Sequence, residues 1–205
     1  MKVLGIAASP RKNGNTLFLV KEALRSAQEE GAETELIALR EKEIKPCDGC
    51  WSCRKTGKCH INDDMQEIYE KLKAADGIIL GSPTYVGNVT SICQAFLERC
   101  TCLIRMKTEG DKVLHSGKTS ALSDKAGGSI VTGRRRGVQG ALDVLNFFLM
   151  MHLMVITHAG VAGFCQSLDP GVIKDEDKDA VAMATELGKV VVDNIKKFAR
   201  DKVLA

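Results

Sequence analysis

The chain has 205 residues, 44% hydrophobic and 27% charged, which is typical of a globular protein long enough to bury a core. A net charge of +3 and an aromatic content of 4% argue against a nucleic-acid or membrane-surface partner. The N-terminal apolar run is too short for a signal peptide, and polar residues interrupt the longest apolar stretch, residues 144–164. We therefore expect a cytoplasmic protein in a reducing compartment, where disulfides are rare.

Short apolar runs alternate with helical periodicities along the first half of the chain. In the first predicted helix, Leu17, Val20 and Leu24 recur at spacings of three and four, and Gly31 ends it. A cysteine-rich stretch separates the second strand from the second helix, for which Asp63 is the expected N-cap. The expected elements are a strand at 2–8, a helix from residue 16, a strand at 34–39, a helix at 63–76, a strand at 77–80 and a helix at 89–105.

The second half continues the alternation after an interruption. Residues 105–127 are polar and have no clear period, which predicts a long loop or lid that can include a partial strand. The further elements expected are a strand at 128–132, a helix at 138–151, a strand at 153–157 and a helix at about 175–200. This pattern predicts an α/β fold: a five-stranded parallel sheet with helices on both faces, in a three-layer sandwich. Without an interdomain linker, residues 1–205 are expected to form a single domain.

The loop SPRKNGNT, residues 9–16, follows the first predicted strand and opens the first helix. In an open α/β sheet, ligands bind beyond the carboxyl ends of the strands, and the free N–H groups of a helix N-terminus suit a phosphate. Ser9 and Thr16 offer hydroxyls, Asn15 an amide and Arg11 a charge, while Gly14 permits close approach of the backbone. The loop lacks both the triphosphate and the dinucleotide glycine motifs. The alternative is a solvated turn with a capping threonine.

Three loops in register carry a family resemblance: GIAASPRKNGNT (5–16), GSPTYVGNV (81–89) and VTGRRRGVQ (131–139) follow the first, third and fourth strands. They resemble the flavin loops of the flavodoxin-like NADPH-dependent FMN reductase family, and the likeness covers nearly the whole chain. The resemblance implies a flavodoxin-like, FMN-binding oxidoreductase. By that resemblance, the residues of the first loop that bind the FMN phosphate are Ser9, Arg11, Asn15 and Thr16, with Asn13 beside them. The residues that flank the isoalloxazine ring are Pro83, Thr84, Tyr85, Val86, Gly87 and Asn88. Those that meet the pyrimidine edge of the ring are Thr132, Gly133, Arg134, Arg135 and Gly137.

The third loop also fits flavin chemistry on its own terms. A two-electron-reduced flavin tends towards an anion, so N–H donors and cations beside it raise its reduction potential. The three consecutive arginines at 134–136 can supply that charge, although a solvated basic turn or a subunit contact would account for them equally well. The loop departs from the family in having Gly137–Val138 where paired glycines are common.

Four of the eight cysteines, Cys47, Cys50, Cys53 and Cys59, lie in the loop at residues 46–60, with the spacing C-x2-C-x2-C-x5-C. Spacings of two let one turn of backbone direct three sulfurs at a single cube, as in ferredoxins, whereas four-cysteine zinc sites usually come as two separated pairs. Gly49 and Gly57 permit the positive φ angles that such a wrap needs. The spacing favours a [4Fe–4S] cluster; zinc and unbound or redox-active thiols are the alternatives.

The flavin loops and the cysteine motif together resemble the iron–sulfur flavoprotein branch of that family. The resemblance implies FMN and a [4Fe–4S] cluster on those four cysteines. It further implies a ferredoxin-like electron donor, a small-molecule acceptor, and a homodimer or homotetramer. The alternatives are a cluster-free NAD(P)H-dependent FMN or quinone reductase and a zinc-stabilised binding module.

The remaining cysteines and two neighbours of the motif give weaker signals. His60 adjoins Cys59 and could ligate a metal, but we expect a capping or solvent role; Trp51 could shield a cluster or simply pack. The other four cysteines are expected in the core: Cys93, Cys100, Cys102 and Cys165.

Overall fold

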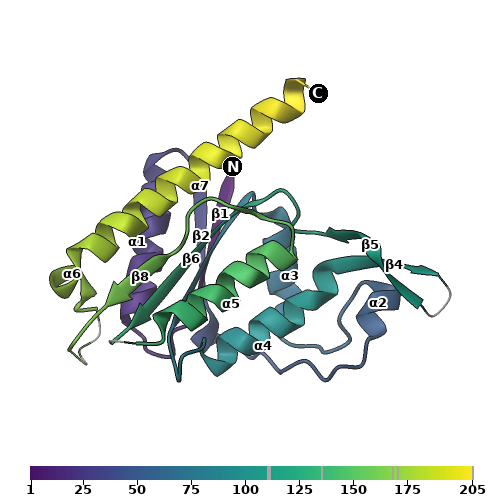
Figure 1. Cartoon of the computed structure of the whole chain (residues 1–205), viewed down its shortest axis with the longest axis horizontal. Coiled ribbons are helices and arrows are strands. Elements are labelled where there is room, and N and C mark those ends of the chain that lie inside the picture. Colours follow the sequence, from purple (N-terminus) through teal and green to yellow (C-terminus); the bar gives the residue numbers. More distant parts are fainter. Residues whose placement is uncertain (110–111, 135, 168, 170, 205) are drawn as a thin grey trace.

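The computed structural model describes residues 1–109, 112–134, 136–167, 169 and 171–204 (Figure 1). Its centre is a parallel sheet in the order β2-β1-β3-β6, and two short strands, β7 and β8, pair with successive parts of β6. The strands are β1 (Lys2–Ala7), β2 (Glu33–Ala38), β3 (Gly77–Pro83), β6 (Ala126–Gly133), β7 (Val155–Ile156) and β8 (Val161–Phe164).

Helices cover both faces of the sheet, as the sequence predicts for a three-layer sandwich (Figure 1). The helices are α1 (Asn15–Glu29), α2 (Ser52–Thr56), α3 (Met65–Ala74), α4 (Ser91–Arg99), α5 (Val138–Met151), α6 (Ile173–Glu176) and α7 (Lys178–Leu204), with 3-10 turns η1 (Leu39–Glu41) and η2 (Cys100–Leu103). No helix among the described residues is long and apolar enough to cross a membrane.

The two faces of the sheet are formed by alternate residues of the buried strands. On β1, Val3 and Ala7 pack with the apolar sides of α1 and α7, whereas Leu4 and Ile6 pack on the opposite face with α3, α4 and α5. The helices are amphipathic, so each buries one side against the sheet. This arrangement brings the carboxyl ends of β1, β3 and β6 to one edge of the sheet.

The segment expected to be a long loop is instead an antiparallel hairpin. Strands β4 (Ile104–Glu109) and β5 (Lys112–Ser120) pair with each other and not with the main sheet. A two-stranded ribbon outside the sheet does not need the apolar run of a doubly buried strand, so its sequence lacks the signal that identified the other strands.

The expected fifth strand is also divided. Only Val155–Ile156 of the predicted segment 153–157 is extended, and β8 occupies the neighbouring stretch of β6. A turn containing Gly160, at φ 115°, separates the two strands. α3 begins at Met65, one residue later than expected, with Asp64 as its N-cap; Asp63 Oδ1 still accepts from the Met65 N–H over 3.1 Å, as expected of a cap, and the same carboxylate also pairs with Arg99.

Candidate flavin edge and cysteine loop

The loops that follow β1, β3 and β6 meet at the carboxyl edge of the sheet. The Ala8 N–H donates to the Gly81 carbonyl over 2.7 Å, and the Thr84 N–H donates to the Thr132 carbonyl over 2.8 Å. The buried hydroxyls of Thr16 and Thr132 share a hydrogen bond of 2.6 Å. All three loops predicted from the sequence to bind flavin are therefore joined at one place.

The start of α1 forms a cradle with little side-chain bulk. Its N-cap is Gly14, which has no side chain to occupy the free N–H groups of the first turn. A Cβ atom built on Gly14 would lie 2.4 Å from Ser9 Oγ. Only glycine at position 14 therefore lets the helix backbone come this close to the Ser9 hydroxyl. A phosphate-sized anion suits such a helix start.

A hollow of about 190 Å³ opens over this cradle. Most of its lining residues belong to the set predicted from the sequence. They are Ser9, Arg11, Gly14, Asn15, Thr16, Pro83, Thr84, Tyr85, Thr132, Gly133, Arg134, Cys165 and Ser167.

Several predicted flavin residues lie beside this hollow and do not line it. Asn13 lines a neighbouring hollow together with Gly171 and Lys174. Val86, Gly87 and Asn88 belong to a tight turn closed by Tyr85 N–H to Asn88 carbonyl (2.8 Å) and the reciprocal bond (3.0 Å).

Gly137 supports that turn from the start of α5, where its carbonyl accepts a hydrogen bond of 2.8 Å from the Thr84 hydroxyl. A Cβ atom on Gly137 would lie 2.8 Å from Gly87 Cα, so the close contact of these two loops requires glycine. Arg134 Nε donates to the Gln166 carbonyl over 3.2 Å. Arg135 falls outside the described residues.

Cys165 and Ser167 are lining residues that the sequence did not reveal. They follow β8, a strand that was not expected, and the Cys165 N–H donates to the Gly133 carbonyl over 3.1 Å. Burial, and then the nearby Glu176 and Asp177 carboxylates, raise the pKa of Cys165 to about 11. Its thiol is therefore protonated near neutral pH. The one sequence signal for β8, and so for the two residues after it, is the short apolar run VAGF at residues 161–164.

The cysteine loop lies between η1 and α3, beside the β4–β5 hairpin (Figure 1). Trp51, Gly49 and Gly57 all have positive φ angles, of 61°, 69° and 73°. The two glycines adopt the positive φ angles expected from the sequence, and Trp51 adds a left-handed residue that bears a side chain. Cys53 and Cys59 are partly buried against the core on the α3–α5 face, while Cys47 and Cys50 are exposed.

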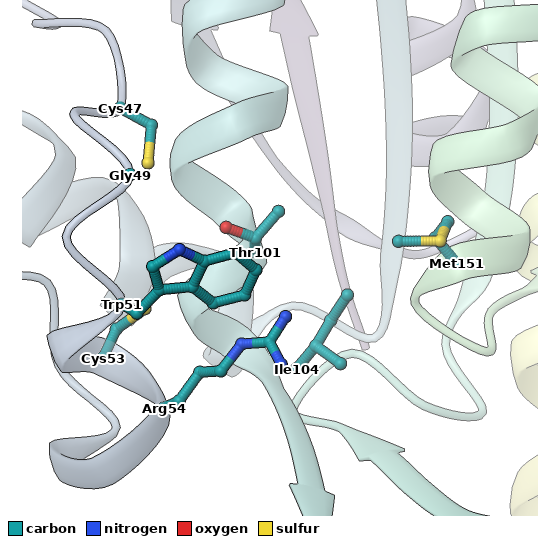
Figure 2. Close-up of a pocket in the computed structure, with 8 residues that line it drawn as sticks. All are labelled: Cys47, Gly49, Trp51, Cys53, Arg54, Thr101, Ile104 and Met151. Carbon is teal, nitrogen blue, oxygen red and sulfur yellow. The ribbon is translucent and has the colours of Figure 1, made fainter. Parts of the chain in front are cut away.

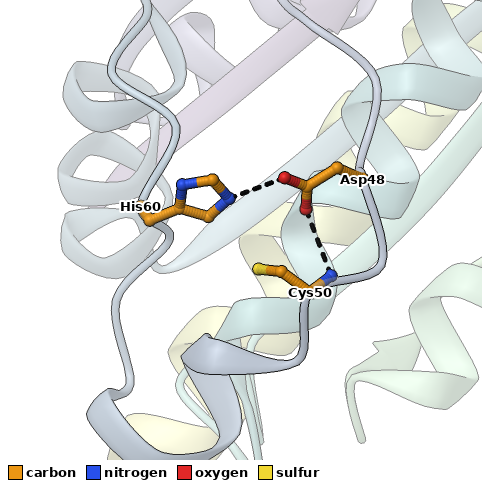
Figure 3. Close-up of side chains that lie close together, drawn as sticks. All are labelled: Asp48, Cys50 and His60. Atoms are coloured by element: carbon orange, nitrogen blue, oxygen red, sulfur yellow. Dashed lines mark hydrogen bonds and ion pairs between the residues drawn. The ribbon is translucent and has the colours of Figure 1, made fainter.

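The four thiols of the loop interact electrostatically. Burial raises the pKa of Cys53, and the thiols of Cys59, Cys50 and Cys47 raise it further, in that order. Negative charge on the Cys53 sulfur is therefore unfavourable unless a cation lies beside it. Around them, His60 Nε2 lies 2.8 Å from Asp48 Oδ2, and the Cys50 N–H donates to Asp48 Oδ1 over 3.1 Å (Figure 3).

A second cavity of about 180 Å³ adjoins the loop (Figure 2). Cys47 and Cys53 line it from the loop, and Thr101, Ile104 and Met151 line it from the main fold. Trp51 lies between these two walls in Figure 2, and the Arg54 guanidinium stacks on the indole, 3.7 Å from the ring centroid. Trp51 is 61% exposed, so it does not seal the cysteines from solvent.

The remaining cysteines are buried, as expected from the sequence: Cys93, Cys100, Cys102 and Cys165. His60 is exposed, and its Nε2 pairs with Asp48 Oδ2.

A parallel α/β sheet with three loops gathered at its carboxyl edge defines the flavodoxin-like class. Solved structures of this class match the fold. An archaeal flavodoxin superposes with a TM-score of 0.57 at 12% identity, covering 96% of this chain and 99% of that one. RosB, in a structure with a bound 8-demethyl-8-formylriboflavin-5'-phosphate intermediate, gives a TM-score of 0.76 at 17% identity, covering 98% of this chain and 81% of that one.

Sequence comparison gives the family. Residues 1–166 match the model of the NADPH-dependent FMN reductases. An iron–sulfur flavoprotein of Methanocaldococcus jannaschii is 38% identical, over 96% of this chain and 98% of that protein. The chain belongs to the NADPH-dependent FMN reductase family, in its iron–sulfur flavoprotein branch. It is an FMN-dependent oxidoreductase.

Proposed function

We propose that this chain is an electron-transfer oxidoreductase with FMN at the edge of the sheet and a [4Fe–4S] cluster on Cys47, Cys50, Cys53 and Cys59. Electrons enter from a ferredoxin-like donor and leave through the flavin to a small-molecule acceptor. The observation that carries this proposal is that all four cysteines lie in one short loop whose Cys53 and Cys59 are partly buried against the core. We further propose that residues 1–205 act as one FMN-binding domain in the cytoplasm and assemble as a homodimer or homotetramer.

The chain's own residues fit FMN at the hollow. The first turn of α1 and the hydroxyls of Ser9 and Thr16 would bind the phosphate, and Arg11 would add charge. The turn 85–88 and Thr84, which is held by Gly137, would orient the ring system. The backbone and Arg134 would face the pyrimidine edge, where N–H groups and cations favour the reduced, anionic form. FMN supplies one- and two-electron redox chemistry when bound.

The spacing of the cysteines along the chain, C-x2-C-x2-C-x5-C, supports a cluster in preference to zinc. A tetrahedral zinc with bonds of about 2.3 Å needs sulfurs about 3.8 Å apart. In the described part of the chain, the one set of three ligand-type atoms within 4.8 Å of one another belongs to Asp48, Cys50 and His60 (Figure 3). No three of the described cysteine sulfurs are that close. A cube of four irons is larger than one zinc and holds its thiolates farther apart.

The charge around the cysteines supports an acidic protein donor. Residues 45–60 contain four cations and one aspartate, a net charge of +3 that equals the net charge of the whole chain. Lys58 is exposed and Lys45 is largely exposed. Attraction to an acidic partner raises the association rate and weakens as salt is added. The reduction rate by an acidic ferredoxin is therefore expected to fall as the salt concentration rises.

A second candidate is a cluster-free NAD(P)H-dependent FMN or quinone reductase, which membership of the NADPH-dependent FMN reductase family favours. The two candidates differ in the preferred reductant. In stopped-flow measurements, rapid flavin bleaching by NADPH with slow bleaching by reduced ferredoxin would favour the second candidate; the reverse order would favour the first.

The deciding experiment is anaerobic purification followed by iron and flavin analysis. We expect a brown protein with about four irons per chain whose absorbance bleaches with dithionite. The Cys53→Ser variant should lose the iron and keep FMN, whereas Cys93→Ala, which removes a thiol outside the loop, should keep both. Wild-type protein that holds FMN but no iron would refute the cluster, and a colourless protein with one zinc per chain would refute the proposal as a whole.

A further inference from the structure

Arg99, the last residue of α4, has a side chain that is 0% exposed. Arginine is rarely buried unless its charge is paired. Its partner is Asp63, whose side chain is 1% exposed, and the shortest of their contacts is 2.5 Å. The pair lies where the cysteine loop leaves and rejoins the main fold.

The guanidinium joins the two ends of the loop. Nη1 donates to the Lys45 carbonyl over 2.8 Å, on the chain that leads into the loop. Nη2 donates to the Ile61 carbonyl over 3.3 Å, on the chain that leads out. Lys45 lies two residues before Cys47, and Ile61 lies two residues after Cys59. One side chain therefore spans the neck of the loop, next to its first and last cysteines.

Neighbouring groups fix the same neck. Asp63 Oδ2 accepts from both Arg99 Nη1 and the Lys45 N–H, the latter over 2.9 Å. From α3, Gln66 Nε2 donates to the Ile61 carbonyl over 2.7 Å and to the Cys59 carbonyl over 3.3 Å. The geometry needs a planar fork with several donors, which arginine has and lysine lacks.

We propose that Arg99 is a positioning residue for the metal centre: by holding the Lys45 and Ile61 carbonyls together, it sets the separation of Cys47 and Cys59 so that all four thiolates can share one cluster. This inference rests on the proposed cluster function. Without the bridge, the neck keeps only the contacts of Asp63 and Gln66 and the His60–Asp48 pair, so its two ends move more and ordering them on binding costs more conformational entropy. Arg99 Nε has no hydrogen-bond partner among the described residues. The guanidinium therefore has one N–H that takes no part in holding the neck.

The test variant is Arg99→Met combined with Asp63→Asn. Methionine removes the bridge, and asparagine avoids leaving a buried, unpaired carboxylate while retaining an oxygen for the Lys45 N–H. The matched control is Arg25→Met with Glu29→Gln, which removes an ion pair of the same kind from the surface of α1. Arg99→Lys serves as the conservative variant that keeps the charge but not the fork.

Each protein is reconstituted with iron and sulfide, and the apoproteins are titrated with Co²⁺ while thiolate absorption is recorded. We expect the double variant to retain FMN and a folded circular dichroism spectrum. Its Co²⁺ affinity should fall about tenfold or more, as for other groups that orient metal ligands, and its cluster EPR spectrum should change. The lysine variant should not restore either property, and the control should match the wild type.

The outcomes separate the two proposals. If wild-type protein and the double variant take up iron equally, bind Co²⁺ with equal affinity and give the same EPR spectrum, Arg99 does not position the ligands and the cluster assignment stands. Full restoration by Arg99→Lys would also overturn the role of the fork. Wild-type protein that takes up no iron overturns the cluster and this inference together.

Discussion

At the first turn of α1, the missing side chain of Gly14 leaves room for the side chains of Ser9 and Arg11 beside the helix start. The backbone at Gly14 is extended, with φ −66° and ψ 154°, so alanine can adopt it without strain. What alanine cannot avoid is a Cβ 2.4 Å from Ser9 Oγ and 3.2 Å from Arg11 Cβ. Both contacts fall on side chains that we assign to the phosphate.

We therefore predict that Gly14→Ala weakens FMN binding about tenfold, or by about 1.4 kcal/mol, and leaves the iron content unchanged. Titration of apoprotein into FMN, followed by flavin fluorescence, measures the affinity. Gln28→Ala, at the exposed far end of the same helix, is the control and should bind as the wild type does. Wild-type affinity in Gly14→Ala would show that the first turn of α1 does not hold the phosphate.

Buried thiols make the folding stability of the protein fall at alkaline pH. Burial raises the pKa of Cys93 to about 12, despite a hydrogen bond with Ser82 that lowers it. The folded state thus keeps a proton that the unfolded chain releases above about pH 9, so folding stability falls as the pH rises from 9 towards 12.

The corresponding prediction concerns the slope of stability with pH. Between pH 8 and 10, wild-type protein should lose about 1.4 kcal/mol more free energy of unfolding than Cys93→Ala, because one fewer thiol is held protonated. Urea denaturation of both apoproteins under reducing conditions at the two pH values gives the comparison. Equal losses in the two proteins would mean that Cys93 ionises alike in the folded and unfolded states.

On the scale of whole elements, α1 and α7 approach each other through a glycine. A Cβ atom on Gly188 of α7 would lie 2.1 Å from the Ala23 carbonyl oxygen of α1 and 3.0 Å from the Ala27 nitrogen. These are backbone atoms, so the contact cannot be relieved by a side-chain rotation.

Glycine to alanine inside a helix ordinarily stabilises a protein by about 1 kcal/mol. Here we predict the opposite sign: Gly188→Ala should lower the free energy of unfolding by about 2 kcal/mol, because the helices must separate. The exposed neighbour, in Lys189→Ala, should change it little. Urea denaturation distinguishes the two variants, and a stabilised Gly188→Ala would show that α7 is free to shift.

The order of elements could be read from the sequence where burial leaves a strong pattern. The doubly buried strands β1 and β3 are continuous apolar runs, and the helices repeat apolar residues every three or four positions. The β4–β5 hairpin and β8 were missed because their stability depends on pairing with distant or exposed partners. Consequently Cys165 and Ser167, which follow β8, were missed as well.

For the two sites, spacing along the chain was informative and long-range contact was not. The cysteine spacing located the cysteine loop, and three motifs located the loops at the carboxyl edge of the sheet to which we assign FMN. Nothing local could indicate that Arg99, 36 residues from Asp63, closes the loop, because a buried arginine looks like any other in sequence. Asp63 was expected to cap a helix because it stands just before an amphipathic segment, and its carboxylate does accept from the Met65 N–H; its ion pair with Arg99 is the part that the sequence could not indicate.

Considered as a whole, the molecule leaves an apolar surface on α5. Phe147 is 62% exposed and Met150 is 60% exposed. Phe147 also borders a groove of about 200 Å³ between α4 and α5, which shares Thr101, Ile104 and Met151 with the cavity at the cysteine loop. Large exposed apolar side chains of this kind are typical of protein interfaces.

If the proposed homodimer or homotetramer uses this surface, Phe147→Glu should convert it to a smaller species by placing a charge in the interface. Light scattering coupled to size-exclusion chromatography measures the mass. Met183→Glu, on α7 and therefore on the opposite face of the sheet, is the control and should leave the mass unchanged. An unaltered assembly in Phe147→Glu would place the interface elsewhere.

The closed neck of the cysteine loop has an evolutionary consequence. Because the Lys45 and Ile61 carbonyls bind the same guanidinium, the chain departs from the flavodoxin-like fold and returns to it at nearly one point. The described pairings of the parallel sheet involve residues outside this segment. A segment inserted in this way can be gained, lost or exchanged as a unit while the loops after β1, β3 and β6 keep their positions. Redox partners can then diversify at a single junction of an otherwise unchanged scaffold.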